Sequence, residues 1–106
     1  MRLPLFLCAL LATAPLAAQT FPAKPLRLVV AFPAGGTADV VARTLAPPLS
    51  AALGHSVVVD NRPGAGTAIA SELVARAPAD GHTLLLTGFS FTANPALRTN
   101  LPFDPL

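Results

Sequence analysis

The chain has 106 residues, with seven lysine and arginine residues against five aspartate and glutamate residues, a formal net charge of +2. The basic residues are scattered and form no stripe, so the composition does not support nucleic-acid binding. A single cysteine excludes an internal disulfide and a cysteine-based metal site. The hydrophobic share of 53% is high for a soluble protein, which predicts strands covered on both faces or surfaces that meet another partner.

The N-terminus has the order of an export signal. A basic Arg2 precedes an apolar run over residues 3–14, and small residues follow at Ala17 and Ala18. The run is shorter than the ~20 residues that span a bilayer. We therefore expect residues 1–18 to be a cleaved signal peptide and the protein to act outside the cytoplasm; the alternative is a buried N-terminal helix.

The following residues predict alternating strands and helices. Three short apolar runs, 26–32, 57–59 and 82–87, are typical of strands buried on both faces of a parallel sheet. Between them, residues 37–53 and 67–77 have helical periodicity. This order predicts an α/β fold, a parallel sheet with helices on both faces.

The expected helices have features that the structure can test. Their large apolar residues recur every four positions, which predicts a buried face on each helix, made of Val41, Leu45, Leu49 and Leu53 in the first and Ile69, Leu73 and Ala77 in the second. Pro47 and Pro48 interrupt the first helix and predict a kink or break. Asn94 and Pro95 have the pattern of an N-cap and first position, predicting a further short helix that starts there.

The loop after the first expected strand is a candidate ligand loop. In such sheets ligands bind beyond the carboxyl ends of the strands, and a helix N-terminus attracts anions. The pattern alone is equally compatible with an ordinary turn, in which Thr37 caps the helix. The candidate binding residues here are Phe32, Pro33, Ala34, Gly35, Gly36, Thr37 and Asp39.

The loop over residues 61–67 contains two glycines but no complete nucleotide motif. A dinucleotide fingerprint needs a third glycine where Ile69 stands. Arg62 either attracts an anion or pairs with Asp60, and both readings stay open at this point.

The loop after the third expected strand contains hydroxyl and amide side chains that suit a polar ligand. Its candidate binding residues are Thr87, Gly88, Ser90, Thr92 and Asn94. The pattern nearly matches the nucleophile elbow of serine hydrolases, but the two histidines, His55 and His82, precede Ser90. We therefore expect no enzyme, no catalytic residue, no metal and no cofactor.

Several sequence blocks, in order and in register, resemble a known family. They are Lys24-Pro25-Leu26-Arg27-Leu28-Val29-Val30-Ala31-Phe32-Pro33-Ala34-Gly35-Gly36, then Val57-Val58-Val59-Asp60-Asn61-Arg62-Pro63-Gly64-Ala65-Gly66, then Ala79-Asp80-Gly81-His82-Thr83-Leu84-Leu85-Leu86, and Asn94-Pro95-Ala96-Leu97 with Asn100-Leu101-Pro102-Phe103-Asp104-Pro105-Leu106. The chain resembles the Bug-type periplasmic solute-binding receptors of tripartite tricarboxylate transporters.

The resemblance implies a two-domain, type II periplasmic binding protein that captures small organic acids and delivers them to membrane permease subunits, and that is a monomer at full length. In that family the loops corresponding to residues 32–39 and 87–94 help to hold the carboxylate, partly through water. The alternatives are a ligand-sensing receptor for a membrane signalling partner or a non-functional truncated product.

The chain departs from the family in two respects. Ala38 and Ala68 stand where polar side chains are common, which removes possible hydrogen bonds. The family's chains also continue well past Leu106. We therefore expect residues 19–106 to be the N-terminal part of a first domain, with the second domain absent, marginal stability alone and weak carboxylate binding.

Overall fold

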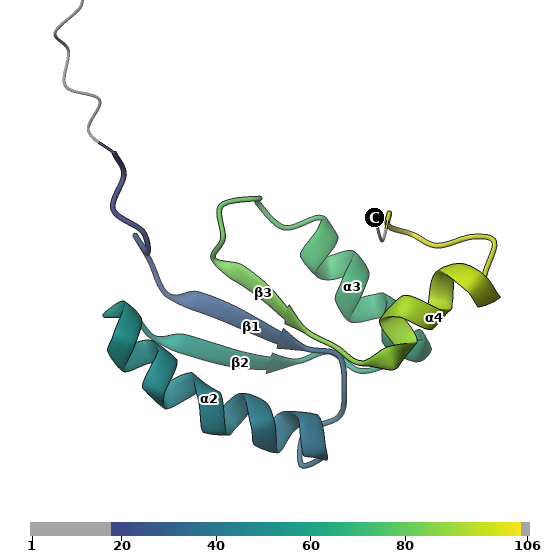
Figure 1. The fold of residues 1–106 in the computed structure, drawn as a ribbon, viewed down its shortest axis with the longest axis horizontal. Coiled ribbons are helices and arrows are strands. Elements are labelled where there is room, and N and C mark those ends of the chain that lie inside the picture. Colours follow the sequence, from purple (N-terminus) through teal and green to yellow (C-terminus); the bar gives the residue numbers. More distant parts are fainter. Residues whose placement is uncertain (1–17, 105–106) are drawn as a thin grey trace, which may run out of the picture.

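A computed structural model describes residues 18–104, so that nearly all of the expected signal peptide lies outside the described residues. Three parallel strands, β1 (Leu26–Val30), β2 (Val57–Asn61) and β3 (Thr83–Leu86), form one sheet in the order β2-β1-β3 (Figure 1). In register, Val30 of β1 lies between Asn61 of β2 and Leu86 of β3, so that the three strands end together at one edge.

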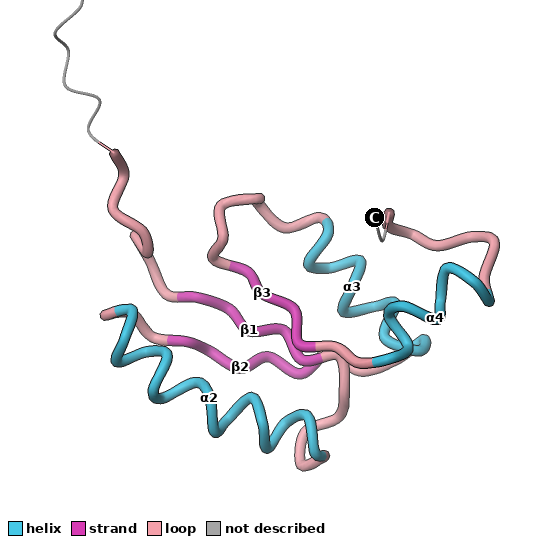
Figure 2. Tube along the Cα trace, in the orientation of Figure 1, coloured by secondary structure: helices cyan, strands magenta, loops and turns pink. Residues whose placement is uncertain are grey.

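The helices alternate with the strands along the chain (Figure 2). They are α2 (Thr37–Leu53), a 3₁₀ turn η2 (Ala65–Thr67), α3 (Ala68–Ala75) and α4 (Phe89–Leu97). α2 packs on the face of the sheet that carries Leu28 and Val30, whereas α3 packs on the face that carries Val29 and Ala31. The predicted parallel sheet with helices on both faces is confirmed.

The buried face of α2 differs from the one predicted, and that of α3 differs in part. Val41, Leu45 and Leu49 of α2 are 44%, 46% and 37% exposed, whereas Ala42 and Ala46 are buried against the sheet. In α3, Ala70 is buried and the predicted Ile69 is half exposed, but the predicted Leu73 does pack against the core of the sheet. Small side chains let each helix lie close to a sheet whose own Leu and Val residues already fill the interface.

Pro47 and Pro48 do not break α2, which is continuous from Thr37 to Leu53. Both prolines lie on the exposed side of the helix. There the carbonyl groups that lose their helical donors are free to hydrogen-bond to water, which lowers the cost of a proline inside a helix. The predicted break is therefore wrong.

The helix expected to start at Asn94 starts five residues earlier, at Phe89, after an extended Gly88. Asn94 and Pro95 therefore lie inside α4 rather than at its start, and that prediction is wrong. Asn94 is buried, and its side-chain amide donates to the Gly66 carbonyl oxygen (2.7 Å). A tertiary contact, and not local capping, accounts for this asparagine.

Candidate ligand-binding site

The carboxyl edge of the sheet brings together the starts of α2, α3 and α4. Gly36 and Gly88, at the N-cap positions of α2 and α4, have no side chain that could cap those helices. Thr67, at the N-cap of α3, makes no capping hydrogen bond either. The alternative in which Thr37 caps α2 is wrong, because Thr37 is already the first helical residue. Helix starts of this kind leave N–H groups available for an anion.

A shallow pocket of about 450 Å³ opens at the start of α2. Its lining combines the apolar side chains of the first loop with the first turn of the helix, and consists of Phe32, Pro33, Gly36, Thr37 and Ala38. Four of the predicted binding residues are thus together in one pocket, and Ala38 is added to them. Ala34 and Gly35 are exposed outside this lining.

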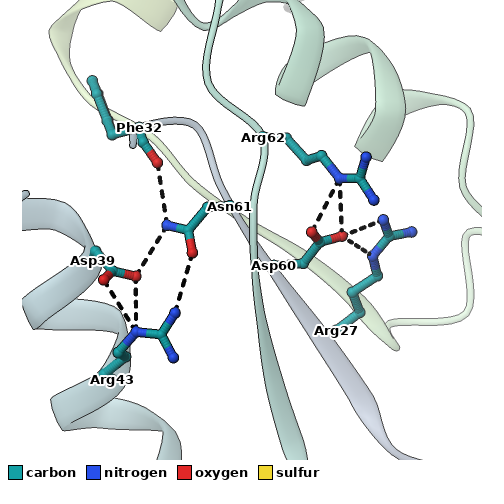
Figure 3. A network of polar contacts seen from close by, with 7 residues as sticks. All are labelled: Arg27, Phe32, Asp39, Arg43, Asp60, Asn61 and Arg62. Carbon is teal, nitrogen blue, oxygen red and sulfur yellow. Dashed lines mark hydrogen bonds and ion pairs between the residues drawn. The ribbon is translucent and has the colours of Figure 1, made fainter. Parts of the chain in front are cut away.

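Asp39 lies beneath this loop and is almost fully buried. Its carboxylate accepts hydrogen bonds from the Gly35 N–H (2.8 Å), from Nε of Arg43 (3.1 Å) and from Nδ2 of Asn61 (3.0 Å). Figure 3 shows the bonds from Arg43 and Asn61. The donors Gly35, Arg43 and Asn61, in that order of importance, lower the pKa of Asp39 from 3.8 to about 2. The carboxylate therefore stays ionised and occupied by the protein's own donors.

The first and third loops touch each other at this edge. A Cβ atom added to Gly88 would lie 3.2 Å from the Phe32 ring, so a larger residue there would press against the ring. The half-buried Phe32 also packs against both core clusters of the sheet. The two segments predicted to bind a ligand are therefore parts of one surface.

The predicted binding residues of the third loop belong mostly to α4. Thr92 donates to the Phe89 carbonyl oxygen (2.9 Å), and Asn94 holds the η2 turn, so both side chains already have partners. Ser90 lies in the first turn of α4. Within residues 18–104, the buried Thr87 hydroxyl has no hydrogen-bond partner.

The second loop contributes structure. Arg62 pairs with Asp60 (3.0 Å), and Asp60 also accepts a hydrogen bond from Nε of Arg27 (2.8 Å) (Figure 3). Burial opposes ionisation of Asp60, but the hydrogen bonds from Arg27 and Arg62 outweigh it and lower its pKa. The pairing alternative for Arg62 is confirmed. Asn61, between Asp60 and Arg62, was not among the predicted site residues. Its position at the end of a strand was the only signal for it in the sequence.

The histidines lie away from Ser90. His55 and His82 precede β2 and β3, at the amino edge of the sheet, whereas Ser90 follows the carboxyl edge. His82 is buried, and its Nε2 accepts a hydrogen bond from the Ala23 N–H (3.1 Å). Neither histidine can act as a base for Ser90 in this arrangement.

The described part of the chain has neither a cluster of metal-binding side chains nor a membrane-spanning helix. In residues 18–104, no three histidine, cysteine, aspartate or glutamate side chains are grouped as metal ligands. None of the described helices is long and apolar enough to cross a membrane.

Comparisons with known proteins show the family of the chain. The family described as "Tripartite tricarboxylate transporter family receptor" matches residues 41–106. The chain is 44% identical over 95 residues to the Bordetella pertussis protein BugT, covering 88% of this chain and 29% of BugT.

Solved structures of similar proteins belong to the same family. The periplasmic binding protein BugD superimposes with a TM-score of 0.75 at 44% identity, over 80% of this chain and 28% of that one. MatC from Rhodopseudomonas palustris, solved with bound malate, gives 0.72 at 37% identity, over 80% and 29%. The chain thus spans under a third of the length of these relatives, which are solute-binding proteins. It belongs to the receptor family of the tripartite tricarboxylate transporters.

Proposed function

We propose that this chain forms part of an extracytoplasmic receptor that binds small organic carboxylates and delivers them to the membrane permease of a tripartite transporter. The single observation that carries the proposal is the pocket at the start of α2, which places a helix N-terminus against an apolar lining. MatC, a structural neighbour, was solved with malate. The sequence pattern of the N-terminus supports export to the periplasm.

The ligand class follows from what the two loops lack as well as from what they contain. Residues 32–39 and 87–94 include no lysine, arginine or histidine. On this side of the site, a carboxylate would be held by backbone N–H groups, hydroxyl groups and the positive end of α2. Such an end stabilises an anion by about 0.3–1 kcal/mol when exposed, and by up to ~2 kcal/mol when partly buried.

The predicted binding residues have different roles in this proposal. Thr37 and Gly36, in the pocket, would contact the ligand, with Ser90 on the side of α4, whereas the buried Thr87 would lie beneath the surface. Asp39 acts indirectly, because its oxygens are used within the protein. Phe32, Pro33 and Gly88 shape the surface between the two loops.

The test is an NMR titration of the ¹⁵N-labelled chain with malate, a method that also detects millimolar affinity. We expect shifts confined to the carboxyl edge, and none with dimethyl malate, in which both carboxylates are esterified. Thr37→Val should weaken malate binding severalfold, because it replaces a pocket hydroxyl by a methyl group.

Thr44→Val is the matched control for that variant. Thr44 is an exposed threonine of the same helix, and its hydroxyl donates to the Val40 carbonyl oxygen (2.7 Å), away from the pocket lining. This variant should bind malate as the unmodified chain does. Equal binding of malate and its dimethyl ester, or no malate shifts at all, would contradict the proposal.

A further inference from the structure

Asn61, the last residue of β2, lies outside every loop assigned to the ligand. Its strand is the neighbour of β1 on the side away from β3, and it leads into the glycine-rich segment for which no ligand role emerged. Yet its side chain points across the sheet edge toward the start of α2 (Figure 3).

The side-chain amide of Asn61 is fully engaged. Nδ2 donates to the Phe32 carbonyl oxygen (3.2 Å) and to Oδ1 of Asp39 (3.0 Å), while Oδ1 accepts from a terminal nitrogen of Arg43 (3.3 Å). All three hydrogen bonds of this amide lead to α2 or to the loop that precedes it. None of these contacts serves the pairing of β2 itself.

These contacts lie on both sides of the ligand loop. Phe32 precedes the segment 33–38, and Asp39 follows it. Asp39 in turn accepts from the Gly35 N–H in the middle of that segment (2.8 Å). One asparagine therefore holds both ends of the loop, and through Asp39 it also supports the loop's centre.

We propose that Asn61 is a positioning residue for the carboxylate site: it fixes the loop over residues 33–38, and with it the first turn of α2, in the conformation that receives the ligand. This inference rests on the proposed function for its ligand, but its effect on the loop can be measured without one. Asn61 itself does not line the pocket.

The pairing of β2 has its own independent reporter. The Arg62 N–H, one residue further along, donates to the Val30 carbonyl oxygen (2.8 Å). Removing the Asn61 amide should leave this bond and the strand register intact. The charged residues Arg27, Asp60 and Arg62 form a separate group on the other side of β2 (Figure 3), and the hydrogen bonds of this group join its own side chains.

The experiment compares the 106-residue chain with Asn61→Ala by amide hydrogen exchange and malate titration, both followed by NMR. In Asn61→Ala the Gly35 amide should exchange about tenfold faster, since Asp39 and Phe32 lose a shared donor. The Arg62 amide should exchange at the unmodified rate. Malate affinity should fall about five- to tenfold. Asn100→Ala, at an exposed asparagine, is the control and should change neither quantity.

The exchange rates at Gly35 and Arg62 either support or overturn the proposal. Faster exchange at Gly35 with unchanged exchange at Arg62 supports the positioning role, even if malate binds neither protein and the proposed function fails. Equal acceleration at both amides shows a general loss of stability and overturns the proposal, as does unchanged exchange at Gly35. If Asn61→Ala does not fold, Asn61→Ser takes its place, and its failure to fold would also overturn the proposal.

Discussion

The two sides of α2 differ in a way that explains how the site is built. The side that faces the sheet carries Asp39, Ala42 and Ala46, all buried. The outer side carries the larger stripe of Val41, Leu45 and Leu49, each between a third and a half exposed. Hydrophobicity alone would have predicted the opposite orientation.

The orientation of α2 follows from the spacing of its small residues and Asp39. Asp39, Ala42 and Ala46 follow one another at spacings of three and four, so they lie on one face of the helix. Turning the larger stripe toward the sheet would rotate α2 by about 100° and carry Asp39 away from Asn61. The alanines let the helix approach closely enough for the Asp39 network to form. The packing of the helix and the support of the ligand loop therefore depend on the same face.

The largest loss of stability is expected from a larger side chain at the contact between α2 and the sheet. Ala42 is completely buried beside Leu28 and Val30. Ala42→Leu should lower the free energy of unfolding by about 1–3 kcal/mol, because the added carbon atoms have no space. Urea denaturation measures the loss. Ala51→Leu, at an exposed alanine of the same helix, should leave stability nearly unchanged, and an equal loss there would contradict the account.

A smaller, pH-dependent effect is expected from Asp39. Its folded pKa of about 2 lies below the ordinary 3.8, so its contribution is fully present above pH 3.8 and is lost as the pH falls toward 2. Asp39→Asn should destabilise the chain at neutral pH by less than Ala42→Leu does, and should flatten the acid limb of its stability curve. Asp80 also has a pKa of about 2, owing first to the His82 N–H and then to Lys24, so part of that limb should remain.

Thermal unfolding between pH 2 and pH 7 provides the measurement. The control is Asp80→Asn, which should remove a second part of the acid limb, while Asp60, whose pKa is also lowered, retains a further part. If the curves of Asp39→Asn and the unmodified chain run parallel below pH 3.8, the Asp39 network does not form in solution.

The order of strands and helices was predictable from the sequence, because continuous apolar runs and four-residue periodicity are local signals. The continuous run at residues 26–32 indicated a strand buried on both faces, and β1 is one. The position of the first loop was predictable too, since it lies between that strand and a helical pattern. Those features depend on residues close together in the chain.

Which side of each helix faces the sheet, and which residues support the candidate site, could not be predicted from such local signals. Asn61 reaches Asp39 across 22 positions of sequence, and Asn94 reaches Gly66 across 28. The local pattern Asn94-Pro95 predicted a helix cap. In the structure Asn94 instead makes a long-range hydrogen bond to Gly66. Contacts of this kind depend on how closely the elements pack, which periodicity does not specify.

The smallest effect is expected on the outer side of α2. Leu45→Lys replaces a residue that is 46% exposed and should change the stability of the monomeric chain by no more than about 0.5 kcal/mol. It should also reduce any self-association at high concentration, because it interrupts the exposed stripe of Val41, Leu45 and Leu49. Urea denaturation at two protein concentrations, with light scattering, separates these quantities. A loss above about 1 kcal/mol at low concentration would show that this stripe, and not the alanine stripe, packs on the sheet. The two sides of α2 would then exchange roles, and Asp39 would be free to face the solvent.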